Sequence, residues 1–258
     1  MEINPTTKSI GELALEVPQA IGILEKWQID YCCKGGRSIE EACAAAGVAV
    51  SELMLEIGGG RNTDEARQWQ NEPLKALKDH IVETHHVFTR DIMETIRQLS
   101  DKVATRHGAN HPEVVQLQKI VHDMADDLIP HMLKEEQVLF PYIEQLEAAV
   151  GRSEEPPVPF FGTVRNPVRM MMAEHDAVGD LLRQARSTTN DYSLPGDACL
   201  SFRALYERLN DVEQDLHQHI HLENNVLFPR AASMEEGVRP TPAFAGNDNG
   251  KCGCGCSH

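Results

Sequence analysis

An eleven-residue pattern that occurs twice constrains the fold of this chain more than any other feature of its sequence. HMLKEEQVLFP begins at His131 and HIHLENNVLFP begins at His219, 88 residues later, and both read H-x-x-x-E-x-x-V-L-F-P. A further histidine lies about one helical hairpin upstream of each copy, at His86 and at His175, 45 and 44 residues earlier. Two helical hairpins of this kind predict an antiparallel four-helix bundle with approximate two-fold symmetry.

Turn and helix-breaking residues divide the rest of the sequence into parts. No stretch shows the alternation of a half-buried strand, so the predicted fold class is all-α. The helical pattern of the bundle is interrupted near HGANHP and TTNDYSLPGD, where we expect the two hairpin connections. The predicted parts are a small helical domain (1–57), a Gly-containing linker (58–72), the bundle (73–232) and a disordered Cys-rich tail (233–258).

Charge and cysteine usage exclude some classes of function. The chain of 258 residues has a net charge of −16, which repels phosphate backbones and argues against nucleic acid as a partner. No apolar run is long enough to span a bilayer, and the N-terminus lacks the pattern of a signal peptide. The seven cysteines form no regular disulfide framework, so we expect a reducing compartment and a cytoplasmic location.

The spacing within each repeat points to metal binding. Positions i and i+4 share one face of a helix, so His131 with Glu135, and His219 with Glu223, each aim two side chains inward. With the upstream histidines, four imidazoles and two carboxylates are enough for two ions bridged by the carboxylates. Nitrogen and oxygen donors without thiolate suit iron or manganese, and the imidazole content favours iron. Coordination positions remain for an oxo bridge or a small ligand.

A single H-x-x-x-E would more often be a surface ion pair. Two copies in register favour metal, because buried His and Glu without partners are unfavourable. Spacing alone does not decide between His85 and His86. The other bundle histidines are expected to face solvent or to support the ligands: His80, His122, His217 and His221.

The residues that flank the H-x-x-x-E pairs allow predictions about the core and about helix ends. The residues that follow each H-x-x-x-E pair are expected in the core: Val138, Leu139, Phe140, Val226, Leu227 and Phe228. Pro141 and Pro229 are expected to end or kink their helices, and Pro130 to kink the helix beside His131.

These motifs resemble a known family. The H-x-x-x-E pairs, the E-H-D of residues 174–176 and the ending ENNVLFP resemble the hemerythrin-like di-iron bundle of the RIC (repair of iron centres) family. GELALEVPQAIGILEKWQIDYCCKGG resembles the small helical domain that precedes the bundle in that family, with its D-Y-C-C-x-G signature from Asp30. The resemblance implies that the iron ligands are His86, His131, His175 and His219, bridged by Glu135 and Glu223.

The resemblance also assigns residues around the site. It implies that Cys32 and Cys33 transfer iron or form a redox pair. Glu174 and Asp127 fall where the family has acidic residues on an access route to the metals, although a Glu is typical at the position of Asp127. The tail residues Cys252, Cys254, Cys256 and His258 have no counterpart in typical members, and are interpreted equally as a metal chelate or as free thiols.

The function implied by the resemblance is repair of iron–sulfur clusters damaged by nitrosative or oxidative stress. Iron would be donated from a μ-oxo and carboxylate-bridged centre of two iron ions, with damaged iron–sulfur proteins as clients. Two alternatives are a nitric oxide reductase, which would make the chain an enzyme, and a hemerythrin-type sensor that binds O2 or NO. A homodimer packed through the small domain is a further possibility.

Overall fold

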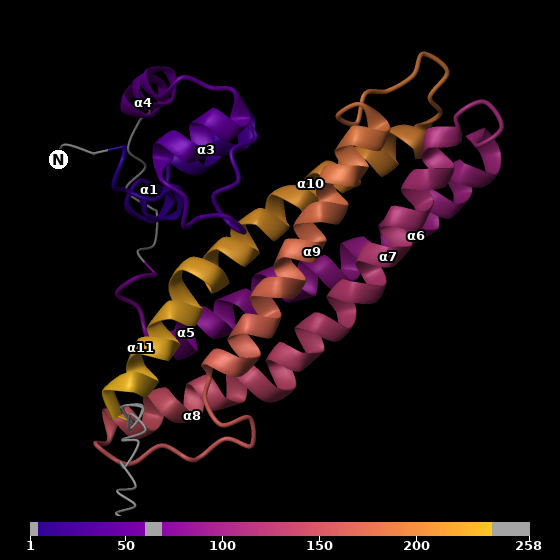
Figure 1. Cartoon of the computed structure of the whole chain (residues 1–258). Coiled ribbons are helices and arrows are strands. Elements are labelled where there is room, and N and C mark those ends of the chain that lie inside the picture. Colours follow the sequence, from indigo (N-terminus) through magenta and orange to yellow (C-terminus); the bar gives the residue numbers. More distant parts are fainter. Residues whose placement is uncertain (1–4, 60–68, 239–258) are drawn as a thin grey trace, which may run out of the picture.

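The computed structural model describes residues 5–59 and 69–238, and nearly all of its regular structure is helical (Figure 1). Within these ranges the sole strand-type pairing is an isolated bridge between Ser9 and Ser38. The predicted all-α fold class is therefore confirmed. The cysteines of the predicted tail, and His258, lie outside the described residues.

The small N-terminal domain is held by short capped helices. Ser9 and Ser38 each begin a helix with a reciprocal capping box, in which the side chains of Glu12 and Glu41 accept from the cap backbone. The third helix ends at Gly47, whose φ of 71° lies in the left-handed region that favours glycine. The four helices are α1 (Ile10–Glu16), α2 (Ala20–Lys26), α3 (Ile39–Ala46) and α4 (Val50–Gly59).

The second part consists of four long helical rods that lie side by side (Figure 1). Residues 108–111 connect the first rod to the second, and residues 190–199 connect the third to the fourth, so each pair forms a hairpin. Helix α6 packs against α7 and α10, and α7 also packs against α9. The rods comprise α5 (Leu74–His80), η1 (Ile81–His86) and α6 (Val87–His107); α7 (Pro112–Lys134), η2 (Glu135–Leu139) and α8 (Phe140–Gly151); α9 (Arg165–Thr189); and α10 (Leu200–Leu222), η3 (Glu223–Leu227) and α11 (Phe228–Val238).

Helix ends differ from the predictions in two places. Helix α11 continues to Val238, so residues 233–238 are helical and do not belong to the predicted disordered tail. Pro141 and Pro229 end no helix, and each is the second residue of the helix that follows a π-helical segment. A π-helical turn already interrupts the i→i−4 hydrogen-bond ladder, so a proline beside it removes few further backbone hydrogen bonds. Pro130 lies inside helix α7, as predicted, and the kinks expected at these three prolines stay predictions.

The interior of the bundle has two apolar clusters separated by a polar layer. One cluster contains Ile92 and Leu128, and the other contains Leu139 and Phe228. The repeated histidines and glutamates occupy the positions between them. Of the residues predicted for the core, Val138 is only half-buried and the other five are buried. Among the described helices, none is both long enough and apolar enough to cross a membrane.

The small domain packs on the fourth rod. Ile220 of α10 belongs to the apolar core of the small domain. The side-chain amide of Asn225 donates to the carbonyl oxygen of Tyr31 at 3.3 Å, and the imidazole of His217 pairs with the carboxylate of Glu25 at 2.9 Å. These contacts bring the loop that carries the paired cysteines next to the bundle.

Candidate metal centre

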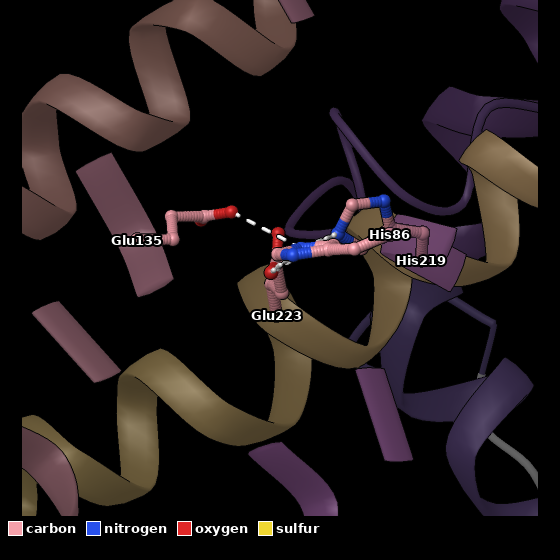
Figure 2. A group of neighbouring side chains, drawn as sticks. All are labelled: His86, Glu135, His219 and Glu223. Atoms are coloured by element: carbon pink, nitrogen blue, oxygen red, sulfur yellow. Dashed lines mark hydrogen bonds and ion pairs between the residues drawn. The ribbon is translucent and has the colours of Figure 1, made fainter. Parts of the chain in front are cut away.

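The six predicted ligands come together in two groups of four. One group is His86, Glu135, His219 and Glu223 (Figure 2), and the other is His131, Glu135, His175 and Glu223. Within each group the donor atoms lie within 4.8 Å of one another, and every one of these side chains is buried. Both glutamates are common to the two groups. Each group takes one histidine from each hairpin.

Local helix geometry sets these positions. His131 and His219 lie one turn before Glu135 and Glu223, so each pair shares a helix face. Both glutamates are the first residues of π-helical segments, and His86 is the last residue of another. Wide turns of this kind occur frequently at functional sites. Here all three lie at the level of the polar layer.

The two carboxylates lie between the histidine pairs. Glu223 has Oε1 3.1 Å from Nε2 of His219 and Oε2 3.2 Å from Nε2 of His175. Glu135 has Oε2 3.4 Å from Nε2 of both His86 and His131. Each carboxylate therefore faces one histidine of each group, which is the arrangement of a bridging ligand.

The imidazole spacing fits a metal ion. The Nε2 atoms of His86 and His219 are 3.2 Å apart, and those of His131 and His175 are 3.0 Å apart. Two nitrogens bonded at about 2.1 Å to one ion, on adjacent corners of an octahedron, are separated by about 3.0 Å. The spacing of each pair is therefore compatible with shared coordination.

Hydrogen bonds at the opposite ring nitrogen orient three of the four histidines. The Nδ1 atoms of His86, His131 and His175 are bonded to Glu136 (2.6 Å), Glu174 (2.7 Å) and Asn224 (2.9 Å). A proton on Nδ1 leaves the Nε2 lone pair free to bind metal. These contacts therefore set the tautomer that coordination requires.

The fourth histidine is held by stacking. The Nδ1 atom of His219 has no hydrogen-bond partner among the described residues. The ring of His85 stacks on it, with 5.6 Å between centroids, and Nδ1 of His85 is bonded to Asp215 at 2.9 Å. The structure thus places His86 in the metal-binding group and His85 behind His219.

The carboxylates are buried without hydrogen-bond donors. All four oxygens of Glu135 and Glu223 accept no hydrogen bond of ordinary geometry from the described residues, and their partners are the imidazole Nε2 atoms at 3.1–3.4 Å. Burial raises the pKa of Glu223, but the imidazoles of His219 and His175 outweigh it and hold that pKa well below its usual range. The carboxylates therefore stay charged, which suits them to binding a cation between the histidine pairs.

The histidines respond to the same charges. Burial lowers the pKa of His131, but the carboxylates of Glu135, Glu223 and Glu174 together outweigh it and raise the pKa to about 9. For His219, complete burial dominates the attraction of Glu223, and its pKa is lowered. The same two opposing effects therefore shift the two pKa values in opposite directions, because carboxylate attraction is the larger at His131 and burial is the larger at His219.

Other predicted residues lie at varying distances from the groups. Glu174 is in direct contact with His131 and also pairs with Lys134. Asp127 is exposed in a surface hollow beside Asp126 and Asp180 and belongs to neither group, so its access role stays a prediction. Cys32 and Cys33 lie near α9, and their Sγ atoms are 3.8 Å apart.

The position of one histidine differs from its prediction, and two orienting residues were not predicted. His221 is buried against the ring of Tyr31, so it neither faces solvent nor supports a ligand. Glu136 and Asn224 were not singled out. Each directly follows the glutamate of the H-x-x-x-E pair in its own repeat and is bonded to the upstream histidine of that repeat, so an alignment of the two repeats contained a signal for both.

Comparison with known families agrees with this geometry. Residues 77–231 match the family described as "Hemerythrin HHE cation binding domain", and residues 6–59 match ScdA_N, "Domain of Unknown function (DUF542)". The chain belongs to the hemerythrin HHE family, preceded by a ScdA_N domain. It is similar to the iron-sulfur cluster repair protein YtfE of Escherichia coli O1:K1 and to that of Escherichia fergusonii. In each case 34% of 227 residues are identical, covering 88% of this chain and 97% of the relative.

Proposed function

We propose that the bundle holds two iron ions, one in each group, with Glu135 and Glu223 as the bridging ligands. The observation that carries this proposal is the sharing of both buried carboxylates between the two histidine pairs. All donors are nitrogen or oxygen, which suits iron better than metals that prefer thiolate. The hemerythrin-type domain supports the same assignment.

We further propose that the chain repairs iron–sulfur clusters after nitrosative or oxidative stress by donating iron. Proteins that resemble this chain over nearly their whole length carry the name iron-sulfur cluster repair protein. In this role iron is cargo as well as ligand-bound metal, so the site must release it. The buried cluster has hydrogen-bonded histidines that keep the donor set in place when the ions leave. Damaged iron–sulfur proteins are the proposed clients.

A second candidate is binding or reduction of small diatomic molecules. Each group offers four side chains, and two of these are shared, so positions remain for NO or O2 at adjacent ions. Adjacent ferrous ions can together supply two electrons to a bound ligand. The protein residues would contribute a buried site that excludes water. A cytoplasmic location is proposed for either function, since the four described cysteines are free thiols.

Metal analysis tests the first step. Full-length protein with serine at Cys252, Cys254 and Cys256 would be purified without oxygen, reconstituted with ferrous iron and desalted. We expect about two irons per chain, measured by plasma emission against protein concentration. A chain that retains zinc, or no metal, after reconstitution would contradict the iron assignment. The matched control is His131→Gln/His175→Gln, which removes the histidines of one group only.

Cluster repair tests the second step. The iron-loaded chain would be mixed with a ferredoxin whose cluster has been damaged by nitric oxide, together with sulfide and a reductant. We expect the cluster absorbance to return without added free iron. Recovery that is equal with the iron-free chain would contradict donation. Formation of nitrous oxide from reduced protein and NO would instead support the second candidate.

A further inference from the structure

A second set of metal-binding donors lies in the small domain, outside the bundle. Asp30, Cys32 and Cys33 each offer one donor atom, and these three atoms lie within 4.8 Å of one another. Both cysteines are free thiols. A set with two sulfurs and one oxygen differs in softness from the nitrogen and oxygen donors of the bundle, yet both sets can bind ferrous iron.

These donors adjoin only one histidine pair of the bundle. The thiol of Cys33 lies 3.6 Å from the backbone carbonyl oxygen of His175. Gly179, one turn further along α9, permits this approach, because a Cβ there would lie 3.3 Å from Cys33 Sγ. His86 and His175 both stack on a phenylalanine, but His219 packs on His85, and no hydrogen bond among the described residues joins His86 or His219 to the cysteine loop.

Asn224 connects the two sets of donors. Its Oδ1 accepts from Nδ1 of His175 at 2.9 Å, and its Nδ2 donates to the carbonyl oxygen of Cys32 at 3.4 Å. One buried carboxamide therefore contacts both a bundle ligand and the cysteine loop. At the equivalent position of the first repeat, Glu136 contacts His86 and Arg90, which both belong to the bundle. The two halves of the metal centre are thus unequal.

A cavity of about 190 Å³ lies beside this contact, between the cysteine loop and part of α9. Asp30, Cys32 and Cys33 line it, together with Gly179 and Arg183 among others. The guanidinium of Arg183 lies 3.7 Å from Asp30 Oδ2, so positive charge already neighbours these donors. A cation that binds there replaces Arg183 as the partner of Asp30. The cavity gives such an exchange room to occur.

We propose that Asp30, Cys32 and Cys33 are a transit site for ferrous iron that serves the position between His131 and His175, and not the position between His86 and His219. This inference rests on the proposed iron-donating function. The exchange is a ligand substitution without change of oxidation state. Imidazole and carboxylate donors are released, and each thiol binds as a thiolate after losing its proton to water.

Iron release to a chelator tests the transit site. Full-length protein with serine at the three tail cysteines would be loaded with two ferrous ions and mixed anaerobically with bathophenanthroline disulfonate. We expect a fast and a slow phase of equal amplitude. Cys32→Ser/Cys33→Ser should still bind both ions but lose the fast phase. Cys199→Ser, which changes a free thiol in the connection before α10, is the matched control and should keep both phases.

Either of two results would overturn the inference: one phase in the parent protein, or parent-like fast release in the double serine variant. Failure of the parent to hold two irons is a separate result, which removes the proposed function itself. Titration with cobalt(II) beyond two equivalents provides a second, independent measurement of metal binding at the cysteines. Thiolate-to-metal absorbance should develop in the parent and be missing in the double variant. Equal absorbance in both proteins would contradict a metal site at these cysteines.

Substitutions of Asn224 separate orientation of His175 from coupling to the cysteines. Asn224→Ala should lower the affinity for one of the two ions by about 10- to 100-fold, since orienting partners contribute this much to metal affinity. Asn224→Asp keeps an acceptor for His175 but removes the donor to Cys32, so both ions should bind while the fast phase slows. Glu136→Ala, the matched control in the first repeat, should change the slow phase instead. An effect of Asn224→Asp on the slow phase alone would contradict the coupling.

Discussion

Glu174 accepts a hydrogen bond from Nδ1 of His131 at 2.7 Å, so a half-buried carboxylate on α9 directs a ring on α7 toward the metal-binding cluster. Removal of this acceptor in Glu174→Ala should lower the affinity of one ion by about 10- to 100-fold. Competition with a calibrated ferrous chelator measures the affinity. Asp176→Ala, two residues away and exposed, is the control. If Glu174 served only an access route, entry rates would change and affinity would not.

The shared carboxylates and the unshared histidines should behave differently. Glu223→Gln removes the charge that both groups use, so both ions should be lost. His175→Gln removes a donor from one group, so half of the iron should remain. Iron content after reconstitution and desalting checks this. Equal losses in the two variants would show that the ions bind only as a pair.

Iron loading should stabilise the fold, because the carboxylates of Glu135 and Glu223 are buried without hydrogen-bond donors. A ligand at about 100 times its Kd adds about 2.7 kcal/mol to the free energy of unfolding. Urea unfolding of loaded and iron-free protein measures the difference. His86→Gln/His131→Gln, with one ligand removed from each group, should show little difference. The same stability gain in that variant would place the bound iron elsewhere.

Neighbouring glycines provide a matched test of domain packing. A Cβ at Gly35 would lie 2.6 Å from the carbonyl oxygen of Tyr31 and 2.8 Å from Asn225 Oδ1, whereas a Cβ at Gly36 meets nothing within 4 Å. Gly35→Ala should therefore destabilise the protein by about 1–3 kcal/mol through overpacking. Gly36→Ala should leave stability nearly unchanged. Thermal unfolding checks both, and equal stabilities would contradict the close packing at Gly35.

Acidification should weaken the packing around His221. Burial lowers the pKa of this histidine to about 4, against a small opposing effect of a hydrogen bond with the Tyr31 backbone. Between about pH 6.5 and pH 4 the unfolded chain binds a proton that the folded chain does not, so stability falls as pH falls. From pH 7 to pH 5 the contribution is about 2 kcal/mol.

A variant isolates this effect from other titrating groups. His217 also titrates at the same interface, and burial and the Glu25 carboxylate act oppositely on its pKa, which is raised overall. Because that pair is present in both proteins, its effect cancels in the difference between the parent and His221→Asn. This difference should shrink from pH 7 to pH 5 in urea unfolding at equal iron content. A difference independent of pH would show that His221 titrates normally.

The repeat was sufficient to predict the helical class and the residues that meet in the polar layer. An i, i+4 pair on a helix has a defined direction, and two copies must face each other to bury their apolar neighbours. That reasoning anticipated the proximity of His131 with Glu135 and of His219 with Glu223.

Other features depend on tertiary contacts that periodicity does not contain. The π-helical segments beginning at Glu135 and Glu223 widen the helix without any Gly or Pro inside them to signal it. The choice of His86 over His85 depends on where Glu136 and Asp215 lie across the bundle. The burial of His221 depends on the position of the small domain, which is distant in sequence.

The pairing of histidines across hairpins has a consequence for synthesis of the chain. His86 is grouped with His219, and His131 with His175, so neither hairpin contains a complete set of donors. A ribosome-bound or proteolysed chain that ends before His175 offers only three of the six ligands. If the bundle holds iron as proposed, capture requires that the chain has been made and folded through Glu223, and shorter copies would not withdraw iron from the cell.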